Sequence, residues 1–211
     1  GVIMDSELSF EEHIVTKVKK ANSIVGIIRR SFSYLDQSTF VKIFIAFVRH
    51  HLEYGQVVWS PHLRKHINMI ENVQIRATKL IDGFGSLTYP ERLKKLNLPT
   101  LAFRRLRGDM IETYKHFHKY DPNILPPSYK PRNRPSRSHK YQIQPIRPRD
   151  GERGLHRNSF YCRIADIWNR LPAAVVDAPT IDTFKNRLDT HWKDLPLKFD
   201  HTATTLTPME E

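Results

Sequence analysis

The feature that most constrains this fold is a run of apolar residues, spaced alternately four and three apart, near the start of the chain. The run comprises Phe10, Ile14, Val18, Ala21, Val25, Ile28 and Phe32. That spacing places every member on one face of an α-helix. The basic residues Lys19, Lys20 and Arg30 fall on the opposite face. A long amphipathic helix needs apolar partner helices, so the pattern predicts a helical bundle.

The residues that flank this helix carry their own signals. The short apolar run at 1–4 suggests the end of a strand, and Ser9 with Glu12 forms a capping box that predicts where the helix begins. After the helix, Asp36 is placed to cap a second one over 37–48. The second helix is apolar on nearly all sides, and we therefore expect it to be buried at the centre of the first domain.

Three more helices are expected before residue 120. Pro61 and Gly83 bracket the first, whose polar side carries three cations and no acid: Lys65, Arg76 and Lys79. Thr88 opens a short second helix with a capping signature, and Thr100 caps the third. Together these elements predict an all-α bundle over residues 1–120.

The remaining sequence changes character at residue 121. Residues 121–158 hold seven of the 14 prolines and nine of the basic residues, which predicts a basic, extended and poorly ordered linker. Apolar periodicity returns in helices expected over 159–170 and 181–192. We therefore expect four parts: a bundle, a linker, a C-terminal helical segment and a disordered tail, over 1–120, 121–158, 159–195 and 196–211.

The charge balance indicates the class of ligand. The chain has 34 Lys and Arg residues against 22 Asp and Glu residues, a formal net charge of +12. Such a surplus attracts polyanions, and the release of counterions strengthens the binding of nucleic acid. We therefore favour a nucleic-acid-binding surface over a generic basic surface that keeps the protein soluble. We assign the contacts to basic, acid-free helix faces, at Lys19, Lys20, Arg30, Lys65, Arg76 and Lys79. Such side chains contact phosphates, and they position a strand without recognising its sequence.

The sequence offers no recognisable catalytic or metal-binding motif. The single cysteine, Cys162, excludes a disulfide framework and a multi-cysteine zinc site. His62 and His66 have the spacing of a helical ligand pair, but His66 falls on the apolar face, which favours a packed histidine. Two acid pairs fit a turn and a helix start better than a two-metal centre: Asp5 with Glu7, and Glu11 with Glu12. We expect no catalytic residue, metal site or cofactor in this chain.

The sequence also has no obvious membrane or targeting segment. No run approaches the ~18 uninterrupted apolar residues of a membrane span. No charged leader precedes an apolar stretch and a cleavage site, so a soluble intracellular protein is expected. Because Gly1 is not an initiator residue, we expect the sequence to be a piece of a longer protein.

A series of short strings over about residues 1–195 carries a family resemblance. The strings are GVIMD at 1–5, LSF at 8–10, HI at 13–14, KAN at 20–22, LEY at 52–54, WSP at 59–61, IENVQ at 70–74, RAT at 76–78, ERLKKL at 91–96, LP at 98–99, RRLRGDM at 104–110, YK at 114–115, WNRLP at 168–172 and FKNRLD at 184–189. In this order they resemble the region after the polymerase palm in non-LTR (LINE-type) retrotransposon reverse transcriptases, particularly jockey-like and chicken-repeat-like elements.

The resemblance implies the thumb and post-thumb region of an RNA-directed DNA polymerase. The thumb of that family is helical and grips the template–primer backbone. The implied partners are therefore an RNA template, an RNA–DNA hybrid or DNA primer, and the upstream palm. That palm holds the catalytic aspartates and their Mg²⁺, so the resemblance assigns neither to this chain. The family implies a location in the nucleus and cytoplasm, without a membrane.

Two other functions fit the sequence as well. The chain can be a free-standing nucleic-acid-binding module derived from such an element, or a helical protein–protein interaction domain. The linker has two interpretations too. It can wrap RNA, with Tyr129 and Tyr141 stacking on bases, or it can serve as a solvated tether.

Overall fold

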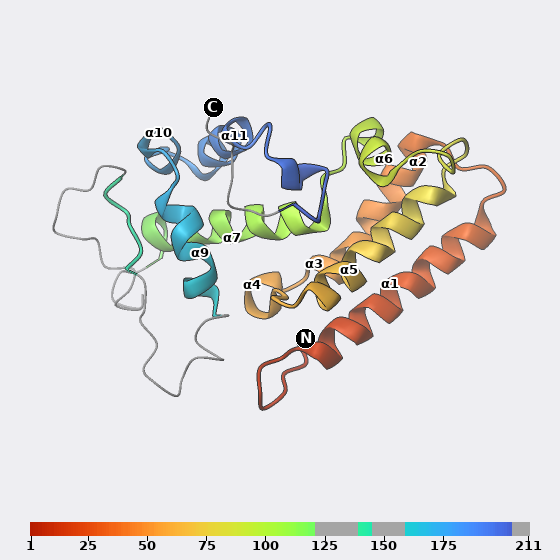
Figure 1. Ribbon diagram of the computed structural model, residues 1–211, viewed down its shortest axis with the longest axis horizontal. Coiled ribbons are helices and arrows are strands. Elements are labelled where there is room, and N and C mark those ends of the chain that lie inside the picture. Colours follow the sequence, from red (N-terminus) through yellow and green to blue (C-terminus); the bar gives the residue numbers. More distant parts are fainter. Residues whose placement is uncertain (121–138, 145–158, 204–211) are drawn as a thin grey trace. The chain divides into compact units, whose positions relative to one another are not determined.

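The computed structural model describes residues 1–120, 139–144 and 159–203, and these residues confirm the all-α prediction (Figure 1). Within those ranges the chain forms helices and turns, with no β-strand. The elements in chain order are α1 (Glu11–Ser31), α2 (Gln37–Ile43), π-helical η1 (Phe44–Arg49), α3 (His50–Glu53), α4 (Gln56–Trp59), α5 (Arg64–Ala77), η2 (Thr78–Leu80), α6 (Tyr89–Leu96), α7 (Leu101–His118), α9 (Phe160–Asn169), α10 (Ala173–Val176), α11 (Ile181–His191) and η4 (Pro196–Lys198).

The chain divides into two compact units at a different place from the predicted boundary. Unit 1 contains Gly1–Arg105 and the segment that begins at Pro196, and unit 2 contains Leu106–Leu195. The division therefore falls within α7 rather than after residue 120. We describe each unit separately.

The predicted apolar face of α1 forms the core of unit 1. Its buried members are Ile14, Val18, Ala21, Val25 and Ile28. They pack with residues of η1, α3 and α5 in one apolar cluster, and α1 runs alongside α5 (Figure 1). Burial of one Val, Leu or Ile side chain contributes about 1.5–3 kcal/mol, so this face fixes the two helices as a rigid pair.

The predicted start of α1 is wrong in its details. The N-cap is Phe10, which has a left-handed φ of 55°, and no side chain caps the helix there. The carboxylate of Asp5 instead accepts hydrogen bonds from the Ser9 and Phe10 amides, at 2.9 and 2.8 Å, and these bonds lower the pKa of Asp5. The expected strand end at 1–4 is absent as well, because the Ile3 amide donates to Nδ1 of His13 at 3.1 Å.

The second helix begins as predicted but is not buried on all sides. The carboxylate of Asp36 accepts the Thr39 amide at 3.0 Å, as an N-cap should. Residues four apart along one face are buried, namely Phe40, Phe44, Val48 and Leu52. On the other face Phe47 is 58% exposed. Unit 1 packs against only one side of this helix, so the apolar residues on its other side remain at the surface.

A buried carboxylate joins three helices of unit 1. Glu71 of α5 is fully buried and accepts the Leu101 and Ala102 amides at the start of α7 and the hydroxyl of Tyr89. Burial and the Glu71 charge raise the pKa of Tyr89. Thr100 caps α7 as predicted, with its hydroxyl accepting the Phe103 amide at 3.0 Å. These bonds hold α5 firmly in place.

The segment after residue 195 is not a free tail where the structure describes it. The Thr100 hydroxyl donates to the Leu197 carbonyl at 2.6 Å, and the Thr100 amide donates to the Lys198 carbonyl at 2.9 Å. Leu197 is buried as a result. The prediction of a disordered tail is therefore wrong for 196–203, while residues 204–211 lie outside the described residues.

Unit 2 contains the two predicted C-terminal helices, observed as α9 and α11. Trp168 and Phe184 are fully buried there, and the Tyr114 hydroxyl donates to the Ala178 carbonyl at 2.6 Å. Thr180 caps α11 as expected, accepting the Thr183 amide at 3.1 Å. The short helix α10 was not predicted from the sequence.

Part of the predicted linker is ordered within unit 2. In the 139–144 segment Ile143 is buried, and its amide and carbonyl both bond the side chain of Asn169 at 2.9 Å. Tyr141 is half-buried and packs against Phe117. The prediction of a poorly ordered linker is therefore wrong for 139–144. Its remainder, with Tyr129, lies outside the described residues.

Candidate nucleic-acid interface

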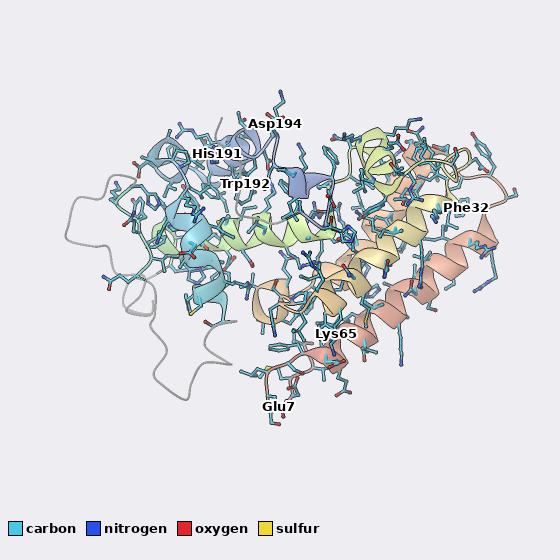
Figure 2. The ribbon with its side chains drawn as sticks, in the orientation of Figure 1. Glu7, Phe32, Lys65, His191, Trp192 and Asp194 are labelled. Atoms are coloured by element: carbon cyan, nitrogen blue, oxygen red, sulfur yellow. The ribbon has the colours of Figure 1, made fainter. Side chains whose placement is uncertain are left out.

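The six cations predicted from the sequence are all exposed, and they are distributed along α1, α5 and η2. Helices α1 and α5 run side by side in the same direction, so the pair has two ends (Figure 1). Figure 2 labels Lys65 near one end and Phe32 near the other. Arg76 and Lys79 lie at the Phe32 end, around a hollow. That Lys65, Arg76 and Lys79 act together stays a prediction, with Lys65 at one end of the pair and the other two at the other end.

Lys65 is already engaged by an acid. Its ammonium group lies 2.9 Å from Oε1 of Glu11, and Nε2 of the buried His66 lies 3.5 Å from the same oxygen. The hydrogen bond from Lys65, followed by that from His66, lowers the pKa of Glu11. The burial of His66 on the apolar side of α5 confirms the prediction of a packed histidine. Lys65 thus has an acidic partner within unit 1.

The cations along α1 separate onto two flanks of the helix. Lys20 lies toward α3, where burial, then His50 and then Lys20 lower the pKa of His51. Lys19 instead precedes Asn22 by three residues and Gly26 by seven, and both of these residues line the hollow. Residues at such spacings share one side of a helix, so Lys19 lies on the hollow side and Lys20 does not.

The hollow lies between the C-terminal half of α1 and the end of α5, and its volume is about 750 Å³. It is lined by Asn22, Val25, Gly26, Ile28, Arg29, Phe32, Ser33, Leu35, Arg76, Lys79, Leu80 and Asp82. Three of these residues are cations, and they come from two helical segments far apart in sequence: Arg29, Arg76 and Lys79. Packing of α1 on α5 therefore brings together charges that no single motif contains.

Arg30 lies at the rim of this hollow. A Cβ atom built on Gly26 would have one neighbour within 4 Å, Nη1 of Arg30 at 3.6 Å. The Arg30 guanidinium therefore extends back along α1 over Gly26. Because Gly26 has no side chain, the helix backbone is accessible at this point.

The acid in the hollow has a structural partner. Oδ2 of Asp82 accepts the Leu35 amide at 2.8 Å, and the Asp82 amide donates to the Leu35 carbonyl at 3.3 Å. This pair ties the α1–α2 connection to the segment after η2. The lining retains a positive balance, with three cations against one carboxylate.

The cations of the hollow lack ion-pair partners in the part of the chain that the structure describes. Neither Arg29 nor Arg76 nor Lys79 has a carboxylate within 4.0 Å there. Cations of unit 2 contrast with them, because Arg107 pairs with Asp189 at 2.6 Å and Arg163 pairs with Asp109 at 3.0 Å. The cations of the hollow are therefore available to an external anion.

Sequence reasoning missed Arg29. We chose Arg30 from the sequence because it lies on the side of α1 opposite the apolar residues. Arg29 instead follows the buried Val25 by four residues and borders the apolar face. A cation at that border lies beside whatever helix packs on the face. This position is the signal that would have identified Arg29.

Other kinds of site are not evident in the described ranges. Residues 1–120, 139–144 and 159–203 contain no group of three or more His, Cys, Asp or Glu side chains placed to hold a metal ion. Cys162 is half-buried on α9. None of the described helices combines the length and apolar character needed to cross a membrane.

Comparisons of the chain with models of protein families, with curated protein sequences and with solved structures find no match. The geometry of the hollow and the distribution of charge around it are therefore the observations on which a functional proposal depends.

Proposed function

We propose that unit 1 binds nucleic acid non-specifically, with the α1/α5 hollow holding the phosphates of a template–primer such as an RNA–DNA hybrid. The observation that carries the proposal is the convergence of Arg29, Arg76 and Lys79 without ion-pair partners among the described residues. Lys19 and Arg30 extend the same positive side along α1.

The physical reasoning concerns the release of counterions. When an unpaired protein cation contacts a phosphate, a counterion condensed on the nucleic acid is released into solution, and that release drives binding. A cation that already pairs with an acid, such as Lys65 with Glu11, gains less because the existing pair must be broken. Three cations on α1 and the adjoining α5 and η2, without ion-pair partners among the described residues, thus favour binding to a backbone of any sequence.

This role agrees with the resemblance to LINE-type reverse transcriptases. In such a polymerase the thumb grips the template–primer while the palm, with its aspartates and Mg²⁺, forms the new bond. We propose that this chain supplies the grip and that the chemistry belongs to the palm. A Tyr/Phe-x-Asp-Asp box upstream in the same reading frame would support the polymerase, and an unrelated upstream sequence would support a free-standing binding module.

The salt dependence of binding tests the proposal. Affinity of the 211-residue chain for an RNA–DNA hybrid is measured by fluorescence anisotropy across a range of salt concentrations. If the hollow makes three phosphate contacts, R29A/R76A/K79A lowers the slope of log affinity against log salt by about two to three. A matched variant, K20A/K42A/K94A, removes three exposed lysines that do not line the hollow and should change the slope by less than about one.

Two results would contradict the proposal. Equal slopes for the two triple variants would mean that the hollow has no special role. No hybrid binding by the wild-type chain would favour the helical protein–protein interaction domain instead. Circular dichroism melting of each variant controls for folding, because Arg29 also lies in the last turn of α1, where a cation stabilises the helix by about 0.3–1 kcal/mol.

A further inference from the structure

An exposed aromatic ring lies among the cations of the hollow. Phe32 lines the hollow at the C-terminal end of α1, and it is 39% exposed (Figure 2). Its backbone is extended, with φ −124° and ψ 119°, so the chain leaves the helix at this residue. Two residues later Tyr34 is 70% exposed on the same connection. The α1–α2 connection thus presents two aromatic side chains beside the basic hollow.

If the hollow only bound phosphates, the side chains of Phe32 and Tyr34 would have no role in binding. Paired bases inside a duplex are stacked on one another, and their faces cannot reach a protein side chain. Unpaired bases expose both faces, and proteins that bind single strands combine cations for the backbone with aromatic rings for the bases. The combination of Phe32 with Arg29 and Lys79 matches that second arrangement.

The size of the hollow is compatible with this kind of ligand. Its volume of about 750 Å³ lies within the range of about 300–1,000 Å³ typical of sites that enclose small ligands. Val25, Ile28 and Leu80 add apolar side chains to the lining of the hollow. The hollow therefore offers an apolar surface to a base and cations to its phosphate.

We propose that the hollow binds an unpaired nucleotide, with a base stacked on Phe32 and the adjoining phosphates held by Arg29, Arg76 and Lys79. The inference rests on the proposed nucleic-acid binding and specifies its ligand as a strand that carries a single-stranded segment. A hybrid with an unpaired overhang is then bound more tightly than a blunt hybrid of the same length. Tyr34 adds a second stacking surface for a neighbouring base.

The test compares three labelled ligands with the same 211-residue chain. They are a blunt RNA–DNA hybrid, the same hybrid with a single-stranded overhang, and the overhang hybrid with abasic sites in place of the unpaired nucleotides. The abasic ligand keeps the phosphates and lacks the bases. The wild-type chain should bind the normal overhang about tenfold more tightly than either other ligand, the gain typical of one aromatic–base stack.

Variants assign the preference to Phe32. F32L removes the ring and keeps an apolar side chain, and it should remove most of the overhang preference, measured as the ratio of overhang to blunt affinity within the same variant. F32W keeps an aromatic ring and should restore the preference. F47L is the matched control, because Phe47 is an exposed phenylalanine of unit 1 that does not line the hollow, and its preference should equal that of wild type.

The possible failures are distinguishable. Equal binding of all three ligands by the wild type, with weaker binding by R29A/R76A/K79A, overturns the stacking inference and leaves the backbone grip intact. Loss of the preference in F47L as well as F32L also overturns it. No binding of any ligand contradicts both proposals. Displacement of the overhang by a poly-glutamate peptide at equal concentration would identify the hollow as an acidic-peptide site and overturn the nucleotide assignment.

Discussion

The two ends of the α1/α5 helix pair contain similar cations in different surroundings. At the end where both helices begin, Lys65 lies 2.9 Å from Glu11 and belongs to an internal ion pair. At the other end Arg76 and Lys79 line a hollow with Arg29, and none of the three has a carboxylate partner in the described ranges. The difference shows that helix faces with the same basic pattern can differ in whether a neighbouring carboxylate lies within ion-pair distance of their cations.

The contrast also concerns what each end responds to. The Lys65 end contains Glu11, whose pKa is lowered by hydrogen bonds from its neighbours, and His13, whose pKa is lowered by burial. The cations of the hollow are guanidinium and ammonium groups, which keep their charge throughout the physiological pH range. Local stability at the first end should therefore depend on pH, and hybrid binding at the second end should depend on salt concentration.

The largest expected effect comes from reversing charge in the hollow. R76E/K79E replaces two phosphate contacts with two repulsive groups and should weaken hybrid binding roughly tenfold to hundredfold at about 0.1 M salt. The control K20E/K94E makes the same change in net charge at exposed lysines outside the hollow. Anisotropy titrations measure both, and an equal loss in the two variants would remove the distinction between the hollow and the rest of unit 1.

A smaller effect is expected from an acid placed directly on the hollow side of α1. A side chain at Gly26 meets little besides Arg30, so Gly26→Glu should fold and pair with Arg30 four residues later. We expect about a tenfold loss of hybrid affinity. Gly26→Gln has the same length without the charge and should retain most of the affinity. A loss of equal size in G26Q would show that bulk, rather than charge, matters at this position.

The smallest expected effect is a loss of local stability at low pH, at the end of the α1/α5 pair where both helices begin. Burial, followed by the charge of Lys17, lowers the pKa of His13 below its usual value of 6.5, and its Nδ1 must be unprotonated to accept the Ile3 amide. Locally opened chains therefore bind the proton more readily than the folded form. The stability that this contact provides is present above pH 6.5 and is lost as pH falls through that region.

Hydrogen–deuterium exchange measures this response. Between pH 7.5 and 5.5, after correction for intrinsic rates, protection of the Ile3 amide and the first turn of α1 should fall by about twofold to tenfold. Amides around residues 76–82 should keep their protection, and His13→Gln should remove the pH response at the first end. An equal loss of protection at the first turn of α1 and at residues 76–82 would contradict the assignment of acid sensitivity to the His13 contact.

The sequence predicted the helices well because each one depends on local spacing. The buried stripe of α1, the caps at Asp36, Thr88 and Thr100, and helices α9 and α11 all follow from residues within a few positions of one another. The predicted capping box at Ser9 and Glu12 failed because Asp5 accepts the Ser9 and Phe10 amides, while the Ser9 hydroxyl accepts the Glu11 amide. Local pattern identifies that a helix forms more reliably than which side chain caps it.

The candidate site was predictable only in part because it is assembled from distant segments. Arg76 and Lys79 were found from their acid-free helix face. Lys65 has the same local pattern, yet it pairs with Glu11, which is 54 residues away in sequence. The hollow itself depends on how α1 packs against α5, which no spacing within one helix specifies. The same holds for residues 139–144, whose proline-rich surroundings gave no sign of their contacts with Asn169.

Lysine footprinting tests the central claim most directly. The chain is acetylated briefly with and without a saturating RNA–DNA hybrid carrying an overhang, and modification at each lysine is measured by mass spectrometry. Lys79 should be strongly protected by the hybrid, Lys19 partly protected, and Lys20 and Lys65 should react at unchanged rates. Protection of Lys65 and Lys20 with no protection of Lys79 would contradict the account.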